Sequence, residues 1–286
     1  TLTCEAAVGG VVGGIFDEKP AGAFQSLSVS SSGNEGPVGF EAAQPISYPN
    51  VALNAYAGGI AGYFQSNFIF IHWSRAQYVS ISGAYNAASG TVSLHKAEDS
   101  MSTELNFYGG GLVGSIGTGD LSLRNSYNRA DVTSFYAGST STVYPRRLTY
   151  AGGLLGYAGD SSWTALLLES CYSSASSVVT SSSTHNGPGG VVGSWGEGST
   201  VTWIDSGSNL NVPDPVFYST SAVPASTPAG NMGSSLSDLP GWIEGRGDAS
   251  MRQAATYSGW DPAICDVADD TLPALRARNT ACALLA

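Results

Sequence analysis

A glycine-rich pattern that occurs five times is the feature that most constrains how this chain folds. The pattern reads Gly-Gly-h-h-Gly-x-h, where h is an apolar residue, and its copies begin at Gly9, Gly58, Gly110, Gly152 and Gly189. Repeats spaced by roughly 40 to 50 residues are typical of solenoids and propellers, in which each repeat is one supersecondary unit. The repeat therefore has to be interpreted before any single motif.

A second pattern follows each glycine-rich copy in the same order. Two apolar residues alternate with small or polar ones, and a Tyr or Gly stands four positions after the second apolar residue. The apolar pairs are Leu27/Val29, Val79/Ile81, Leu121/Leu123, Leu166/Leu168 and Val201/Trp203. The aromatic position holds Tyr85, Tyr127 and Tyr172 in the middle copies and Gly33 and Gly207 in the outer two. Alternation with a period of two predicts a half-buried strand.

The glycines of the first pattern are expected to have a structural role. Alternate residues of a strand share a face, so Leu112, Gly114 and Ile116 are predicted to point the same way. The central glycine should leave room for a large side chain from a facing strand, and the repeat tyrosine is a candidate. The leading pair suits a corner that needs positive φ or a close backbone approach. The glycines assigned to these positions are Gly9, Gly10, Gly13, Gly58, Gly59, Gly62, Gly110, Gly111, Gly114, Gly152, Gly153, Gly156, Gly189, Gly190 and Gly193.

The two patterns are separated by a variable number of residues, which indicates loops that project from one side of a regular stack. No single copy can bury its apolar face, so stacking at about 4.8 Å per coil is expected, and five coils would span roughly 25 Å. A propeller would need four strands per blade, and only two or three are evident. The predicted fold is all-β: a parallel β-solenoid, or β-helix, of about five coils with projecting loops and a C-terminal cap.

The periodicity stops after residue 212, which divides the chain into three predicted parts. Residues 1–212 form the repeats, residues 213–230 form a connection rich in Pro, Ser and Thr, and residues 231–286 form a C-terminal cap or assembly segment. A short helix is expected between residues 236 and 251. A terminal cap would shield the unpaired strands of an end coil. Alternatively, one terminus pairs with the next subunit by strand addition and produces a filament.

Composition excludes some classes of partner. The formal charge of −11 argues against nucleic acid, whose binders place Lys and Arg against phosphates. No apolar run approaches the roughly 18 to 20 residues of a membrane helix. The chain begins at Thr1 and shows no signal peptide, so we expect a processed, exported protein that is secreted, extracellular or on the cell surface.

The four cysteines are Cys4, Cys171, Cys265 and Cys282, and their spacing does not favour a zinc or redox site. Cys265 and Cys282 both fall in the tail and are the candidate disulfide, while a Cys4–Cys171 bridge is less favoured. Cys171 occupies the repeat position of Ala84 and Ser126, which predicts a small buried residue.

The repeats resemble a known family. Residues 110–132, GGLVGSIGTGDLSLRNSYNRADV, and residues 152–178 are similar to GLUG-type repeats of bacterial surface adhesins, filamentous-haemagglutinin-like proteins and the stalks of IgA-specific metalloproteases. Residues 251–261 resemble the segment that often closes such arrays. The resemblance covers about residues 9–260 and implies a parallel β-helical stalk. The long inserts of the first two copies depart from it.

No catalytic, metal or cofactor site is predicted. The histidines His72, His95 and His185 are scattered, and no protease, hydrolase or nucleotide-binding motif occurs. Asp120, Arg124, Arg129 and Asp131 could form the acidic and basic cluster of a polysaccharide-active β-helix, although ordinary solvated positions explain them better. Asp266, Asp269 and Asp270 lack the spacing of a Ca²⁺ loop.

A tripeptide and three aromatic residues are further candidates for binding a partner. Arg246-Gly247-Asp248 matches the integrin-binding tripeptide, for which a plain turn is the simpler interpretation. Trp73, Tyr144 and Trp163 could stack on sugar rings, but such residues more often pack in a core.

The sequence therefore predicts a non-catalytic extracellular structural protein, a subunit that assembles with copies of itself into a surface filament or layer. The alternative is an adhesin module that binds a glycan or host protein through the loops after Gly13 and Gly62, including residues 67–77. A polysaccharide-active enzyme is the third and least favoured hypothesis.

Overall fold

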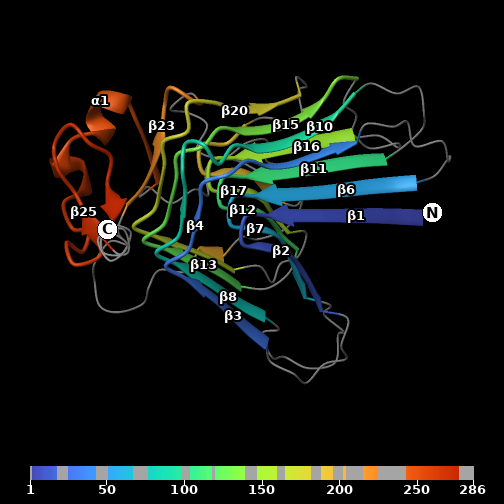
Figure 1. Cartoon of the computed structure of the whole chain (residues 1–286), viewed down its shortest axis with the longest axis horizontal. Helices are drawn as coiled ribbons and strands as arrows, with labels where there is room; N and C mark the ends of the chain where they lie inside the picture. The colour runs from blue at the N-terminus through green and yellow to red at the C-terminus, as the bar shows by residue number, and fades with distance from the viewer. Residues whose placement is uncertain are drawn as a thin grey trace.

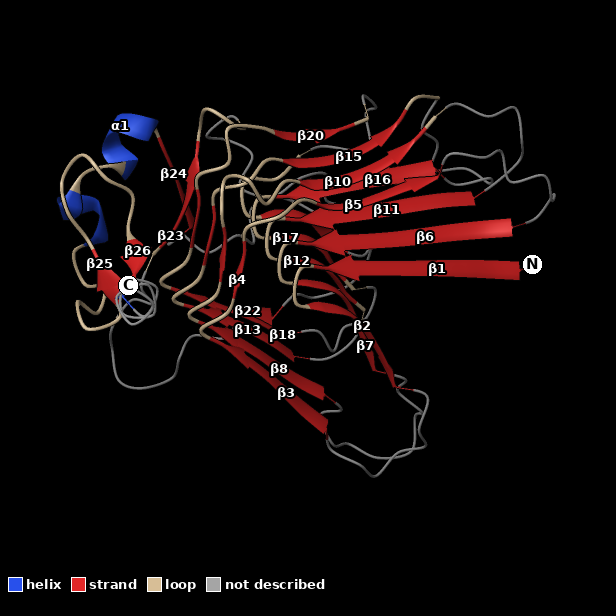
Figure 2. Cartoon of the chain, in the orientation of Figure 1, coloured by secondary structure: helices blue, strands red, loops and turns tan. Residues whose placement is uncertain are grey.

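The computed structural model of the chain is built almost entirely from parallel strands (Figures 1 and 2). The structure describes residues 2–17, 25–42, 51–66, 77–97, 104–117, 120–138, 147–159, 165–181, 188–195, 202–203, 215–223 and 243–276. These residues form a parallel β-solenoid, which confirms the fold class predicted from the repeats.

Successive coils add one strand to each of five parallel sheets, here named A to E. Sheet A contains β1 (Leu2–Gly9), β6 (Val51–Gly58), β11 (Glu104–Gly110) and β16 (Arg147–Gly152). Sheet B contains β2 (Val12–Asp17), β7 (Ala61–Ser66), β12 (Val113–Ile116), β17 (Leu155–Ala158) and β21 (Val192–Trp195). Sheet C contains β3 (Gln25–Ser30), β8 (Gln77–Ser82), β13 (Asp120–Arg124), β18 (Ala165–Glu169) and β22 (Thr202–Trp203).

The other two sheets complete each coil. Sheet D contains β4 (Gly33–Asn34), β9 (Tyr85–Asn86), β14 (Tyr127–Asn128), β19 (Tyr172–Ser173), β23 (Val216–Ser219) and β24 (Ile243–Arg246). Sheet E contains β5 (Val38–Ala42), β10 (Val92–Lys96), β15 (Val132–Tyr136) and β20 (Val178–Thr180). Each coil thus has up to five strands, more than the two or three evident from the sequence, because the two patterns include only the last residue of each sheet A strand and none of sheet E.

The two sequence patterns set the register between coils. Gly9, Gly58, Gly110 and Gly152 are aligned in sheet A, and Gly152 bridges to Gly189. The apolar pairs of the first four copies of the second pattern are aligned in sheet C in the same way. The fifth pair is wrong: Trp203, and not Val201, is the register partner of Leu166, and Phe217, not Gly207, is the register partner of Tyr172. Equivalent residues of successive repeats therefore stack in columns along the solenoid.

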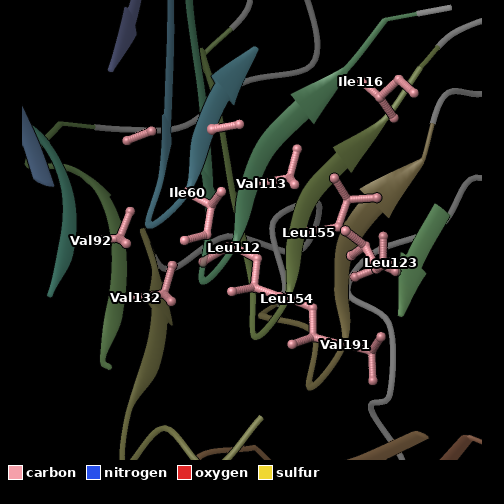
Figure 3. Close-up of a cluster of buried hydrophobic side chains, with 14 of the residues drawn as sticks. Ile60, Val92, Leu112, Val113, Ile116, Leu123, Val132, Leu154, Leu155 and Val191 are labelled. Atoms are coloured by element: carbon pink, nitrogen blue, oxygen red, sulfur yellow. The ribbon is translucent and has the colours of Figure 1, made fainter. Parts of the chain in front are cut away.

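The stacked columns fill one continuous core. Figure 3 shows the column formed by Ile60, Leu112, Leu154 and Val191, with its neighbours from sheets B, C and E. These four side chains are completely buried. Each apolar side chain packs against the equivalent side chains of the neighbouring coils. An apolar residue at the same position of every repeat therefore keeps the core filled.

The strand face predicted for Leu112, Gly114 and Ile116 is wrong. The backbone N–H groups of Leu112 and Val113 both donate to the carbonyl oxygen of Leu154, at 2.9 Å each, and β12 begins only at Val113. Leu112 therefore lies in the bend before the strand, and both Leu112 and Val113 enter the core. Simple alternation fails because the corner bends the chain between the two residues.

The reason predicted for the central glycine is also wrong. A Cβ on Gly114 would lie 2.4 Å from the carbonyl oxygen of Gly62 and 2.8 Å from the backbone nitrogen of Ala57. The space beside Gly114 is therefore filled by backbone atoms of the neighbouring coil, and not by a tyrosine from a facing strand. The leading pair serves the same close approach, since a Cβ on Gly58 would lie 2.0 Å from the carbonyl oxygen of Ala61. The leading pair was predicted to need either positive φ or a close backbone approach, and the close approach is confirmed.

A left-handed residue makes the corner between sheets C and D. Ser31, Gly83, Asn125 and Ser170 occupy the same repeat position, with φ between 49° and 63°. Left-handed backbone costs a non-glycine residue about 1–2 kcal/mol, and Asn and Gly tolerate it best. This corner explains the small or Asn-like position in the second sequence pattern.

Sheet D continues beyond residue 212. Strand β23 lies within the predicted connection, and β24 pairs parallel with β23. Then follow the helix α1 (Asp248–Met251), the 3-10 helix η2 (Ala254–Tyr257) and the antiparallel pair β25 (Cys265–Asp266) and β26 (Ala274–Leu275). The short helix expected between residues 236 and 251 is α1.

The C-terminal segment forms a second, smaller core. Met251, Tyr257, Trp260, Cys265 and Leu275 pack against Tyr127, Tyr172 and Phe217 of sheet D. Figure 1 shows α1 and β25 beside this sheet. The segment that we call the side cap, residues 247–276, thus covers the outer face of sheet D in the third to fifth coils. It lies along the side of the solenoid, whereas the sequence interpretation had placed it over an open end.

Candidate functional site

The end of the solenoid formed by the first coil is the candidate functional site. Each of β1, β2, β3, β4 and β5 is the terminal strand of its sheet. Figure 1 shows β1 and β3 at the lower margins of sheets A and C. The outer edges of these five strands therefore have no partner among the described strands. Such edges are templates for pairing with another chain. We name this surface the first-coil end.

One repeat position is exposed in the first coil and buried in the other coils. Val11 is the first-coil equivalent of Ile60, Leu112, Leu154 and Val191. Those four are 0% exposed, but Val11 is 46% exposed. The side chain is of the same kind in the same place, and no described coil lies on its outer side. Covering it would remove apolar surface from water.

Other core columns show the same change at the first coil. Cys4 is in register with Leu53 and Leu105, which are buried, yet Cys4 is exposed. Leu27 and Phe40 are only half-buried, whereas their register equivalents in the inner coils, Val79 and Leu121 for Leu27 and Leu94 for Phe40, are buried. The first-coil end is therefore an apolar surface with the geometry of an inner coil.

Two acidic side chains of the first coil, Glu35 and Glu41, have partners in the second coil. The Tyr85 hydroxyl donates a hydrogen bond to Glu35 Oε1 at 3.1 Å. The Glu41 carboxylate lies 4.0 Å from His95 Nδ1. Glu5 is exposed on sheet A, one coil from Asn54. The Glu35 and Glu41 carboxylates are therefore engaged within the chain.

The opposite end of the solenoid is closed and uneven. Val191, Val192, Val216 and Val223 are all nearly inaccessible to solvent. In the described residues, sheet D continues two strands past β19, while sheet E ends at β20. The two ends of the molecule therefore differ both in exposure and in shape.

Stacked tyrosines of sheets A and B form a second prominent feature. Tyr56 stacks on Tyr63 at 3.9 Å and on Tyr108 at 5.1 Å between ring centroids, and Tyr150 and Tyr157 extend the group. Burial raises the pKa of the Tyr56 hydroxyl well above its usual value, with further contributions from Tyr63 and Tyr108. Because the ring faces cover one another, they are not open for stacking on a sugar. The arrangement is best explained as a structural ladder.

The repeat tyrosines form another ladder, on the outer face of sheet D. Tyr85, Tyr127 and Tyr172 stack with centroid separations of 5.6 and 5.0 Å. Arg129 Nε donates to the Tyr172 hydroxyl oxygen at 2.8 Å, and the Tyr172 hydroxyl donates to the carbonyl oxygen of Pro273 at 2.6 Å. These tyrosines therefore hold the side cap.

The residues considered for a polysaccharide-active site have separate structural partners. Arg124 pairs with Glu169 at 3.1 Å, and Arg129 holds the side cap. The Asp131 carboxylate accepts hydrogen bonds from the backbone N–H groups of Ser176 and Ser177. Asp120 is buried in sheet C. These four side chains therefore do not come together in one site.

The remaining charged candidates are likewise engaged. Asp266 pairs with Arg276 at 3.0 Å, Asp269 accepts from the backbone of Ala254, and Asp270 lies in a left-handed turn. In the tripeptide at residues 246–248, Arg246 pairs with Glu244, and Asp248 accepts from the Ser219 hydroxyl at 2.7 Å. These contacts fit a structural turn.

The thiols are found in two environments. Cys4 is exposed, while Cys171 and Cys265 are buried, and all three are free thiols. Burial raises the pKa of Cys171 to about 12 and that of Cys265 to about 11. Cys171 matches Ala84 and Ser126 in burial, as predicted. Cys282, the proposed disulfide partner of Cys265, lies outside the described residues.

Several predicted features also lie outside the described residues. They are His72, Trp73, Tyr144, Trp163, His185, and the loops 18–24 and 67–76 on which the adhesin alternative depends. His95 lies half-exposed on sheet E and stacks on Phe135. Within the described ranges, no group of three His, Cys, Asp or Glu side chains could hold a metal ion, and no helix is long and apolar enough to cross a membrane.

Sequence reasoning located the repeats but missed the first-coil end as a site. The available signal was the alignment of Val11 with the inner-coil residues, which becomes informative only once exposure is known. Comparison with known proteins adds nothing further: no family model, curated protein or solved structure matches the chain.

Proposed function

We propose that the protein is a non-catalytic structural subunit of an extracellular filament or layer, which assembles with copies of itself through the first-coil end. The observation that carries this proposal is the exposure of Val11, at a position that is fully buried in every other coil. A second copy docked at this end would cover the Val11 side chain.

Both the backbone and the side chains of the first-coil end favour association. Unpaired strand edges readily accept another strand, and native proteins normally block them with charge, proline or a covering segment. At the first-coil end, Glu35 and Glu41 have partners in the second coil. Association therefore buries apolar surface and pairs backbone groups without burying these carboxylates.

The extracellular setting is supported by the resemblance of the repeats to GLUG-type surface proteins and by the low content of charged residues, 12%. A stable rod that exposes one adhesive end suits a surface assembly better than a catalyst, since the structurally engaged charges leave no clustered acid and base in the part that is described.

The test is the association of wild type compared with Val11→Asp. Wild type should self-associate with increasing concentration in sedimentation velocity, and negative-stain microscopy should show particles larger than one copy. Val11→Asp should weaken association by about 100-fold, because a carboxylate would have to be desolvated at the contact.

Ile264→Asp is the matched control. Ile264 is 36% exposed on the side cap, away from the first coil. This variant should associate as wild type does. A wild-type protein that stays strictly monomeric at all concentrations would refute the proposal, as would equal effects of the two substitutions.

A further inference from the structure

We propose that the side cap, residues 247–276, is a lid that detaches from the outer face of sheet D as one unit while the solenoid stays folded. Opening would expose the aromatic rings of Tyr127, Tyr172 and Phe217, which are buried when the cap is closed. The lid lies over the third to fifth coils, so its opening does not depend on the self-assembly proposed for the first-coil end.

The side cap has a core of its own on the outer face of sheet D. Met251 and Trp260 of the cap pack in one cluster with Phe217 of β23. The neighbours of Phe217 along the strand, Val216 and Tyr218, belong to the main core on the other face of the sheet. Segments with separate cores can open separately. The main core therefore stays covered by sheet D when the cap leaves.

Side-chain hydrogen bonds attach the cap to the solenoid. The Ser219 hydroxyl donates to Asp248 Oδ1 at 2.7 Å. Arg129 Nη2 and the Tyr172 hydroxyl both donate to the carbonyl oxygen of Pro273, at 2.7 and 2.6 Å. In the described part of the chain, β25 and β26 of the cap pair with each other and not with sheet D. Opening therefore breaks these side-chain contacts without separating two strands of the solenoid.

Gly247 is the pivot of the lid. Strand β24 ends at Arg246, whose carbonyl oxygen accepts a hydrogen bond from the backbone N–H of Thr220 at 3.0 Å, and α1 begins at Asp248. A Cβ placed on Gly247 would have nothing within 4 Å, so the backbone has space to turn there. The strand can therefore stay paired in sheet D while the segment that follows moves away.

Two buried polar groups beneath the cap have no hydrogen-bond partner among the described residues. They are the hydroxyl of Tyr127 and the Nε1–H of Trp260, on side chains that are 2% and 6% exposed. A buried donor without a partner costs free energy, because its bonds to water are lost and not replaced. Opening returns both groups to water. The closed cap is therefore less stable than its apolar contacts alone would make it.

Three natural thiols report on this motion. Cys4 is exposed, Cys265 is buried in the core of the cap, and Cys171 is buried in the main core. In a Cys282→Ser background, the full chain is treated with a maleimide, and mass spectrometry follows the labelling of each cysteine. Cys4 should react first. Cys265 should react as the cap opens, at least about 100-fold faster than Cys171, which requires the solenoid itself to unfold.

Tyr127 and Tyr172 provide a matched pair of variants with opposite expected effects. Both rings are buried in one ladder, 5.0 Å apart, and the Tyr172 hydroxyl is bonded to Arg129 and Pro273. Tyr127→Phe removes the unsatisfied hydroxyl and should slow the labelling of Cys265 by about tenfold. Tyr172→Phe removes the bonded hydroxyl and should accelerate the labelling by about tenfold.

Labelling of Cys265 well before Cys171, with opposite effects of the two substitutions, supports the lid. Equal labelling rates of Cys265 and Cys171 would show that the cap and the solenoid unfold together, and would overturn it. Unchanged or faster labelling in Tyr127→Phe would show that this hydroxyl does not destabilise the closed cap, and would overturn it as well. None of these results bears on self-assembly, which sedimentation of Val11→Asp tests separately.

Discussion

Asn86 donates a hydrogen bond from its side-chain amide to Oδ1 of Asn128, its register partner in the next coil, at 3.0 Å. The Asn34 amide donates to Oδ1 of Asn86 at 2.8 Å, so three coils share one ladder. The glycine corner packs on this ladder, because a Cβ on Gly59 would lie 2.4 Å from Cγ of Asn86. The two sequence patterns are therefore coupled in space.

Replacing the middle of this ladder should be costly. Asn86 is fully buried and also donates to the carbonyl oxygen of Gly90 at 2.8 Å. Asn86→Ala leaves buried polar partners unsatisfied, so the free energy of unfolding should fall by about 2–3 kcal/mol. Urea titration followed by circular dichroism measures this change. Asn54→Ala, in the two-membered and partly exposed ladder with Asn106, should cost less than about 1 kcal/mol. Equal losses would contradict the ladder's role.

The central glycine should not accept a methyl group. Gly114→Ala places Cβ within 2.4 Å of the backbone of the neighbouring coil, which cannot move without separating two strands. We expect a loss of about 3 kcal/mol or a failure to fold. Gly36→Ala is the control, because nothing lies within 4 Å of its Cβ. Thermal melting of the two variants side by side tests the contrast, and a stable Gly114→Ala protein would be inconsistent with the close approach.

Arg129 should fix the side cap to the solenoid. Its Nη2 donates to the carbonyl oxygens of Leu272 and Pro273, at 3.2 and 2.7 Å, and its guanidinium lies 4.7 Å from the Tyr127 ring centroid. Arg129→Ala should raise the rate of proteolytic cleavage within residues 247–276 by about 30-fold or more, because it removes about 2 kcal/mol of contacts.

Two controls accompany this prediction. Arg252→Ala removes an exposed arginine from the same segment and should leave the cleavage rate unchanged. Arg129→Lys keeps the charge but not the forked geometry, and should behave more like the alanine variant. Rapid cleavage of wild type in the same segment would count against a fixed cap.

Stability should fall in alkaline solution. Burial raises the pKa of Cys171 to about 12, from 9.0 in the unfolded chain, and burial also raises the pKa of Tyr172. Below about pH 9 both states hold these protons. Above it the unfolded chain releases the thiol proton first, so stability decreases by about 1.4 kcal/mol per pH unit for that group. Urea midpoints measured from pH 8 to 11 should show the decline.

Cys171→Ala tests whether the Cys171 thiol causes this decline. Alanine should fit there, because Ala84 already occupies the equivalent position. The variant should keep most of its stability at pH 8 and show a shallower decline above pH 9. An unchanged slope would mean that the thiol does not contribute.

Much of the fold could be predicted from the repeats. The glycine pattern and the Leu121/Leu123-type pairs recur in one order, and recurrence with variable spacing already implies stacked coils with loops. The strands of sheets A and E could not be found this way, since Val38, Val92, Val132 and Val178 align only after the chain has turned through the corners. The tyrosines Tyr56, Tyr108 and Tyr150 of sheet A also recur in register, but neither they nor these valines belong to the two patterns.

The sequence by itself determined that equivalent residues must stack, because no single repeat can bury its apolar face. Only the tertiary structure decided why the glycines are needed, where the tail packs and which end is open. Those outcomes depend on contacts between residues distant in sequence, such as Gly114 with Gly62 and Tyr172 with Pro273. Val11 and Ile60 are alike in sequence. Ile60 lies between two described coils and is buried, whereas Val11 has a described coil on one side and is exposed.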